Sequence, residues 1–455
     1  MIRLKIFYTL FILLVMNWFV MAQDDNHVCS TTFPTLEWEN EFQKLISDFV
    51  GKQSNREFSA MAYTIPVVFH IIHSGEAVGT YPNITHEQIM SQIDVLNQDF
   101  GGNAHNVADY PANAFVHWAA NQALPEANKD NNGRVKIANF NIQFCLATKD
   151  ALGHSLAEPG IDRINYHTKG WPDPTNFSTQ MTFKNYLDNI VKPNSIWDVK
   201  KYLNVWITDK STLLMNGGVS SVPPMSTLPG IPNTATDSTD GIWCYTKSIG
   251  SYALFPFGQY FSSNIDGRTL THEVGHYLGL RHIWGDANCG NDFCGDTPPA
   301  SAQNGGMPVY PHKAGSCSVP SNHPDGEMFM NFMDYTLGPG KYMFTTDQMI
   351  RAQTAMANSP FRNQLGNHDL CTAVSNLNEQ KQTTTPIIYP NPASGDVYVN
   401  LSGQNLKRID IYNQTGSFIQ SFGTSVFSVE HLPQGIYFFI IYTDKVIFTH
   451  KMIKE

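Results

Sequence analysis

The chain has 455 residues, which is too long for one ordinary domain and suits two or three. Hydrophobic residues make up 42% and charged residues 15%, a balance that fits globular domains and excludes a largely disordered chain. The formal net charge is -10 and no dense run of Lys and Arg occurs, so no nucleic-acid partner is expected.

The chain begins with a predicted secretory signal peptide, residues 1–22. Two basic residues precede the almost wholly apolar stretch 6–20, and Ala22 offers a small residue for cleavage before Gln23. An uncleaved membrane anchor is the alternative interpretation, but 6–20 is short for a membrane span. No other segment reaches transmembrane length, so we expect no transmembrane span in the mature form.

Residues 23–56 form a short polar segment that carries Cys29. An amphipathic helix is expected over 36–49, and an exposed linker around Arg56 offers a target for a protease. These features predict a pro-segment that is removed from the mature protein.

Residues 57–375 are predicted to form the main domain. A β-branched apolar run predicts a buried strand over 65–72, and Thr85 can cap a helix over 86–100. Strands that alternate with helices predict an α/β (α+β) arrangement. The other expected elements are strands over 136–146, 203–208 and 241–248, the last an edge strand, and a long surface excursion over 213–240.

The end of the chain has a different character. Residues 376–386 are polar and include a Thr triplet, which predicts a linker. Residues 387–455 contain short alternating runs separated by Gly and Pro. This spacing predicts a small C-terminal β-sandwich.

The main functional motif is HEVGHYLGLRH, residues 272–282. On a helix, His272 and His276 are four residues apart and lie on one face, so both imidazoles can bind one metal ion. Gly279 lets the chain leave the helix, and the turn brings His282 round as a third ligand. Three neutral imidazoles with an open fourth position suit one catalytic zinc ion. A chance arrangement of core or solvent histidines is the competing interpretation.

Glu273 follows the first histidine and can reach a metal-bound water from the side. It is the candidate general base, which takes a proton from this water and later delivers it to the leaving amine. Zinc lowers the pKa of the water and polarises the scissile carbonyl. These roles predict hydrolysis of peptide bonds in protein or peptide substrates.

Met333 lies further along the chain in NFMDY, residues 331–335. The motif HExxHxxGxxH followed by a methionine turn is typical of the metzincins, which the chain resembles here. The resemblance implies that Met333 packs beneath the zinc ligands. It also implies that the Tyr335 phenol borders the zinc and hydrogen-bonds the tetrahedral intermediate. Packing alone is the competing interpretation for both residues.

Within the metzincins, the chain resembles the pappalysin family (peptidase family M43, similar to ulilysin and the cytophagalysins). The resemblance implies a zinc metalloendopeptidase domain with a twisted mixed sheet and an active-site helix. The motifs that carry it are IPVVFHII (65–72), DVLNQDF (94–100), PGIDRINY (159–166), YLNVWI (202–207), HEVGHYLGLRHIWGD (272–286), DTP (296–298), NFMDYT (331–336) and YMFTTDQ (342–348).

The same resemblance implies structural calcium after the third histidine, where Asp286, Asp296 and Thr297 offer oxygens. A turn that caps itself is the alternative. Arginine-specific members of the family carry an acidic residue and a cysteine shortly after the methionine turn. Residues 336–340 read TLGPG instead, so the resemblance does not extend to cleavage before arginine.

Seven cysteines in an exported chain predict disulfides and leave at least one thiol outside internal pairs. Either Cys289 or Cys294 is expected to bridge to Cys317, and the sequence leaves this choice open. Some family members cap the zinc with a pro-segment cysteine, and the resemblance implies such a zinc switch at Cys29. A disulfide of Cys29 with Cys371, or a free thiol, is the alternative.

The C-terminal module resembles the type A sorting domain of type IX secretion, found in the Bacteroidetes. The resemblance implies the outer-membrane secretion machinery as a partner and a secreted or cell-surface location. A carbohydrate- or surface-binding β-module is the alternative. The matching motifs are YPNPASGDVYVN (389–400), IYNQTG (411–416), LPQGIYFFII (432–441) and HKMIK (450–454).

Together these features predict a secreted zinc-dependent endopeptidase that is made as a precursor. A catalytically inactive surface adhesin with structural zinc is the alternative, but a structural site does not need the Glu273 carboxylate. A zinc hydrolase of non-peptide substrates has no distinctive support. The substrate is expected to lie extended and to pair with an edge strand.

The sequence divides into five expected parts: signal peptide 1–22, pro-segment 23–56, catalytic domain 57–375, linker 376–386 and sorting domain 387–455.

Overall fold

The computed structural model describes residues 28–29, 31, 35–53, 62–150, 152–214, 216–224, 235–261, 266–317, 324–371, 387–401, 405–414, 417–443 and 447–455. The predicted signal peptide, Arg56 and the predicted linker 376–386 lie outside these ranges. Within them, no helix is both long enough and apolar enough to cross a membrane.

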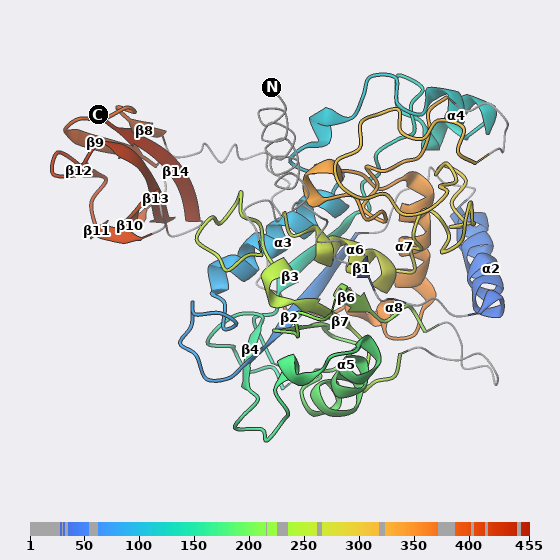
Figure 1. Ribbon diagram of the computed structural model, residues 1–455, viewed down its shortest axis with the longest axis horizontal. Helices are drawn as coiled ribbons and strands as arrows, with labels where there is room; N and C mark the ends of the chain where they lie inside the picture. Colours follow the sequence, from blue (N-terminus) through green and yellow to red (C-terminus); the bar gives the residue numbers. More distant parts are fainter. Residues whose placement is uncertain are drawn as a thin grey trace, which may run out of the picture.

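A seven-stranded mixed sheet organises the main domain (Figure 1). Its central strand is β2 (Tyr63–His73), which is parallel to each of its neighbours. β3 (Ile142–Leu146) and β4 (Ile161–Asn165) pair with successive parts of β2 on one side, and β5 (Leu203–Thr208) pairs with it on the other. Both faces of β2 are buried, which explains its nearly continuous apolar sequence.

The sheet continues from β5 through β7 (Ile242–Tyr245), β6 (Asn216–Ser220) and β1 (Val28–Cys29). β7 is parallel to β5, β6 is antiparallel to β7, and β1 is parallel to β6. The prediction of an edge strand over 241–248 is therefore wrong, because β7 lies between two other strands. β6 lies inside the predicted surface excursion 213–240, where the sequence NGGVS lacks the β-branched pattern typical of a strand.

Helices cover both faces of this sheet (Figure 1). α3 (His86–Phe100) and α6 (Arg268–Tyr277) pack on one face and share the larger apolar core with β2, β5 and β7. α5 (Gln180–Tyr186) packs on the other face against side chains of β5 and β7. The predicted cap of α3 is confirmed, since Thr85 Oγ1 accepts a hydrogen bond from Gln88 N at 3.3 Å.

The expected helix over 36–49 is present as α2 (Leu36–Gln53). It lies along the outside of the main domain, beside α7 (Thr346–Asn358), with Trp38 and Phe42 buried against Ala355 (Figure 1). Two shorter helices complete the domain, α4 (Val116–Asn121) and α8 (Arg362–Leu365).

The C-terminal module has its own apolar core between two antiparallel sheets, so the predicted β-sandwich is confirmed. The larger sheet has the order β11-β10-β13-β14 and the smaller one β12-β9-β8. Their bounds are β8 Ile387–Tyr389, β9 Asp396–Asn400, β10 Leu406–Asn413, β11 Phe418–Phe422, β12 Val426–Ser428, β13 Gly435–Thr443 and β14 Ile447–Lys454.

Candidate metal centre

The HEVGHYLGLRH sequence forms the second half of α6 and the turn that follows it. His272 and His276 lie one helical turn apart, and both side chains are buried. The helix ends at Tyr277, and Gly279 adopts a φ of +91°, which favours glycine. This reversal of the chain brings His282, also buried, back beside the other two imidazoles.

The three imidazoles turn their Nε2 atoms toward one another. His276 Nε2 lies 3.0 Å from His272 Nε2 and 3.1 Å from His282 Nε2. Within the described ranges, these three residues form the one group of His, Cys, Asp or Glu side chains whose ligand atoms all lie close enough to hold a metal ion.

The outward nitrogen of each imidazole has a hydrogen-bond acceptor. His272 Nδ1 lies 2.8 Å from Phe332 O, and His276 Nδ1 lies 2.8 Å from Leu280 O. His282 Nδ1 bonds the carboxylate of Asp286. These acceptors place a proton on each Nδ1 and leave the inward Nε2 lone pair free for a metal. Asp286, which the sequence analysis considered as a calcium ligand, thus orients the His282 ring.

Burial, and after it the neighbouring imidazoles, lower the pKa of His272 and His276 well below the usual value. Both rings are therefore neutral at neutral pH, the form in which imidazole binds metals. Three converging lone pairs with no proton between them could bind a cation, and an all-nitrogen ligand set suits zinc.

Glu273 is 1% exposed and lies beside the histidine cluster under the strand β6. Its Oε2 accepts a hydrogen bond of 3.0 Å from Thr31 Oγ1, and Thr31 Oγ1 accepts one of 2.8 Å from Ser220 N at the end of β6. Residues from the N-terminal segment and from β6 thus enclose this carboxylate. Nothing in the sequence pattern around Thr31 pointed to this contact.

Gly218 of β6 leaves the space that Glu273 occupies. A Cβ at Gly218 would lie 2.6 Å from Glu273 Cγ and 2.7 Å from Oε1, closer than real Cβ contacts.

We expect Gly218→Ala to displace the Glu273 carboxylate and lower kcat by about a hundredfold, since a misplacement of about 1 Å has effects of this size. Peptide hydrolysis and bound zinc should be measured together. Unchanged activity, or loss of zinc in parallel with activity, would contradict this role of Gly218.

Tyr335 lies beside the histidine cluster. Its ring centroid is 5.7 Å from that of His272 and 5.1 Å from that of His282. Trp284 stacks on His282 with a centroid distance of 4.3 Å and meets Tyr335 edge-on at 4.9 Å. The Tyr335 ring therefore lies next to two of the three clustered imidazoles and to Trp284, and it remains partly exposed.

Met333 is fully buried beneath α6. A Cβ at Gly275 would lie 2.4 Å from Met333 Sδ, so the absence of a side chain at Gly275 allows the sulfur to reach the helix backbone. Asn331 Oδ1 accepts a hydrogen bond of 2.9 Å from Met333 N and fixes this turn. The structure thus places Met333 directly under the helix that carries His272 and His276.

The other two residues considered as calcium ligands, Asp296 and Thr297, form hydrogen bonds with different partners. Asp296 Oδ2 accepts hydrogen bonds of 2.9 Å from Asn128 Nδ2 and from Asp347 N. Thr297 Oγ1 lies 2.7 Å from Asp292 Oδ2 and 2.9 Å from Cys294 O. Sequence reasoning missed Asp292, although it stands only five residues before Thr297.

Two disulfides occur among the described residues, Cys145–Cys371 and Cys289–Cys317. The first excludes the alternative pairing of Cys29 with Cys371. The second settles the open choice in favour of Cys289, and leaves Cys294 as a buried free thiol. The backbone of Cys29 lies on β1, opposite Gly218 of β6, while its side chain is outside what the structure describes.

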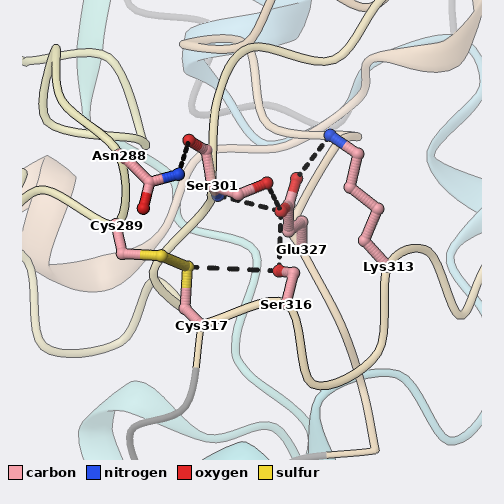
Figure 2. The surroundings of a disulfide bond; sticks show 7 residues. All are labelled: Asn288, Cys289, Ser301, Lys313, Ser316, Cys317 and Glu327. Atoms are coloured by element: carbon pink, nitrogen blue, oxygen red, sulfur yellow. Dashed lines mark hydrogen bonds and ion pairs between the residues drawn. A yellow bond between two sulfur atoms is a disulfide. The ribbon is translucent and has the colours of Figure 1, made fainter.

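Glu327 connects separate segments of the loop around the Cys289–Cys317 disulfide through hydrogen bonds and an ion pair (Figure 2). It is fully buried and accepts hydrogen bonds from Ser301 N at 2.9 Å and from Ser316 Oγ at 2.7 Å. Lys313 Nζ lies 3.2 Å from its other oxygen. The disulfide and this carboxylate together hold the segment that follows the third histidine.

Two family models match the chain. One, described as peptidase M43, pregnancy-associated plasma protein-A, matches residues 185–357 and includes all three histidines. The other, described as a secretion system C-terminal sorting domain, matches residues 387–455.

Two solved structures of one protein and one further known protein are similar over most of the chain. A promirolysin mutant from Tannerella forsythia is 29% identical, with a TM-score of 0.52, and covers 74% of this chain and 97% of that chain. Mature mirolysin from the same organism, in complex with a cleaved peptide, is 30% identical over 68% of this chain and 100% of that chain, with a TM-score of 0.49. An extracellular metalloprotease of Colletotrichum graminicola is 25% identical over 327 residues, 71% of this chain and 87% of that protein.

Proposed function

Because the chain belongs to the pappalysin family (peptidase M43) and is a secreted zinc-dependent endopeptidase, we propose that His272, His276 and His282 hold its catalytic zinc and that Glu273 is the general base. The observation that carries this proposal is the convergence of three neutral imidazole nitrogens beside a buried carboxylate. The alternative of an inactive adhesin has no support from the relatives, which are metalloproteases.

His272, His276 and His282 would hold the zinc ion, which would lower the pKa of a bound water molecule and polarise the scissile carbonyl. Glu273 takes the proton of the attacking water and passes it to the leaving amine. The Tyr335 hydroxyl donates a hydrogen bond to the oxygen of the scissile carbonyl as negative charge develops there. Asp286 keeps the His282 ring in position throughout.

We propose that residues 23–56 are a pro-segment that covers this site. β1 occupies the outer edge of β6, and Thr31 hydrogen-bonds the general base. When the segment is removed, β6 becomes the edge of the sheet and can pair with an extended substrate. Cys29 stands on β1 beside this site, which supports the proposal that its thiolate caps the zinc in the precursor.

The test is cleavage of a broad peptide library by the activated protein with and without a chelator. Cleavage that stops on chelation and returns with added zinc is the expected result. If the protein is folded, carries zinc, has lost residues 23–56 and cleaves no peptide, the proposal fails.

We also propose that calcium binds at the loop 292–297, with Asp292, Asp296 and Thr297 as side-chain ligands. Burial raises the pKa of Asp292 and of Asp296 to about 7, and in Asp296 the neighbouring Asp347 adds to this effect. Asp296 Oδ1 is buried with no hydrogen-bond partner. A bound cation would compensate these buried acids.

We expect calcium to raise the Tm of the calcium-depleted, zinc-loaded protein by about 5 °C or more, because a ligand that binds only the folded state stabilises it. Asp292→Asn should remove most of this shift without loss of zinc. Differential scanning calorimetry with and without calcium measures the effect. An equal calcium response in Asp292→Asn and the wild type would exclude Asp292 as a ligand.

The C-terminal module is a secretion sorting domain, and the protein is secreted or held at the cell surface. We propose that its partner is the outer-membrane machinery of type IX secretion. We further propose the division into residues 1–22, 23–56, 57–375, 376–386 and 387–455 described above.

A further inference from the structure

The helix α2 of the proposed pro-segment fills a groove on the catalytic domain. Trp38 and Phe42 are both buried there, against Val222, which follows β6, and Ala355 of α7. Trp38 Nε1 also donates a hydrogen bond of 3.1 Å to Pro223 O. The walls of this groove therefore belong to the catalytic domain, while the helix that fills it belongs to the pro-segment.

Gly279 makes room for one of these aromatic rings. A Cβ at Gly279 would lie 2.6 Å from Phe42 Cε1, closer than real Cβ contacts. The Arg351 guanidinium lies over the same ring, 4.7 Å from its centroid. Phe42 thus packs onto the turn that separates the second and third histidines of the metal-binding motif.

The groove also holds a buried carboxylate between two cations. Glu39 Oε1 lies 2.7 Å from Arg351 Nη1, and Glu39 Oε2 lies 2.8 Å from Arg281 Nε. The side chains of Glu39 and Arg351 are almost completely buried, and among the described residues no other carboxylate forms an ion pair with Arg351. Removal of the anion from such a pair is strongly unfavourable, because it leaves an uncompensated buried charge.

The two arginines are held by the catalytic domain itself. Arg351 belongs to α7 and donates hydrogen bonds of 3.2 and 2.9 Å to Gly279 O. Arg281 directly precedes His282, and its guanidinium lies over the Phe293 ring at 5.4 Å. The positive end of the groove is therefore part of the metal-binding motif and does not depend on the pro-segment for its place in the chain.

The contact with the catalytic carboxylate and the contacts with the groove come from different parts of the pro-segment. Thr31 hydrogen-bonds Glu273, whereas the groove contacts come from α2. A cut of the chain between residues 53 and 62 breaks none of these contacts. It lowers the effective concentration of the pro-segment from about millimolar, while tethered, to that of the protein in solution. The strength of the α2 contacts then decides whether the site opens.

We propose that the groove under α2 is a helix-binding site that keeps the pro-segment bound after the chain is cut, so that the processed protein stays inactive until α2 dissociates. The inference rests on the proposed function, since it takes residues 23–56 as a pro-segment that is cut from the catalytic domain. The ligand of the groove is an amphipathic helix that carries a carboxylate between two aromatic residues, at the spacing of Trp38, Glu39 and Phe42.

The test uses precursors with the recognition site of a specific protease placed between residues 53 and 62. After the cut, at about 10 μM protein, the wild-type fragment should co-elute with the catalytic domain in size-exclusion chromatography, and peptide hydrolysis should stay low. The Glu39→Gln fragment should separate and activity should appear at once, because the buried arginines lose their anion. Glu41→Gln, at the exposed surface of the same helix, should behave as the wild type does.

A second measurement does not need turnover. Both substitutions lie in the segment that is removed, so the cut Glu39→Gln precursor supplies a catalytic domain with the wild-type sequence. A synthetic peptide of residues 35–53 should bind this freed protein in calorimetry with a Kd of about 1 μM or tighter. The same peptide with Glu39→Gln should bind about a hundredfold more weakly, and with Glu41→Gln equally well. If the freed protein binds the peptide but cleaves no substrate, the proposed function fails while the role of the groove is upheld.

Separation of the wild-type fragment from the catalytic domain directly after the cut would overturn the proposal, even if the Glu39→Gln precursor fails to fold. Equal binding of the 35–53 peptide with and without Glu39→Gln would overturn it as well, because the buried carboxylate would then not be what the groove recognises. The peptide lacks Cys29 and Thr31, so its binding reports on the groove and not on contacts at the histidine cluster.

Discussion

Replacement of Glu273 by alanine is expected to lower kcat/KM for peptide hydrolysis by at least about a thousandfold, because a positioned general base contributes factors of this order. The metal should stay in place. The three histidine Nε2 atoms and the acceptors Phe332 O, Leu280 O and Asp286 do not depend on the Glu273 side chain. The measurement is hydrolysis of a fluorogenic peptide together with the zinc content of the same sample.

The matched control for this variant is Glu126→Ala. Glu126 has a side chain that is 92% exposed and, among the described residues, forms an ion pair with Lys129, so its removal should leave activity and zinc unchanged. A Glu273→Ala protein that binds zinc and keeps more than about a tenth of the wild-type rate would refute the assignment of the general base. Loss of zinc from the variant would instead mean that the carboxylate supports the metal site.

Replacement of Glu39 by alanine is expected to release the proposed pro-segment, residues 23–56, from the catalytic domain. Glu39 of α2 is fully buried between two cations, with Oε1 2.7 Å from Arg351 Nη1 and Oε2 2.8 Å from Arg281 Nε. Removing one partner of a buried pair costs about 3–5 kcal/mol, which corresponds to a shift of roughly a hundredfold or more in the docking equilibrium. The unprocessed Glu39→Ala protein should therefore show activity that the wild-type precursor lacks.

Glu41→Ala on the same helix is the matched control. Glu41 pairs with Lys44 at the exposed surface of α2, where an ion pair contributes little. Limited proteolysis of residues 23–56 and hydrolysis by the intact precursor would compare the two variants. If the Glu39→Ala and Glu41→Ala precursors are equally inactive, α2 does not depend on the ion pairs of Glu39 for docking.

The Glu39 carboxylate should also make the inactivity of the precursor depend on pH. Burial alone would raise the pKa of Glu39, but the charge of Arg351 and hydrogen bonds from Arg351, Gln43 and Arg281 outweigh it and hold the pKa below 4.5. Because the pKa is lowered in the docked state, the contribution to docking is present above the ordinary pKa and is lost as pH falls through the lowered one. Acidification below about 4.5 should thus expose the pro-segment to proteolysis in the wild type. Glu39→Gln should lose this part of the pH dependence.

The sequence by itself determined the elements that local spacing encodes. HEVGHYLGLRH places two histidines on one helix face through the 3.6-residue period, and Gly279 marks the turn to the third. β2 and β5 follow from β-branched apolar runs, because strands buried on both faces need apolar residues throughout. The C-terminal sandwich follows from its regular alternation and turns.

Only the tertiary structure decided which distant segments meet. Thr31 reaches Glu273 across 242 residues of sequence, and Glu39 reaches Arg351 across 312. β6 escaped prediction because its sequence has low strand propensity, while Gly218 makes room for the close approach of Glu273. The pairing of Cys371 with Cys145 also depends on chain paths that no local pattern specifies. Periodicity records which face of an element is buried, whereas the group that packs against that face is set by the whole fold.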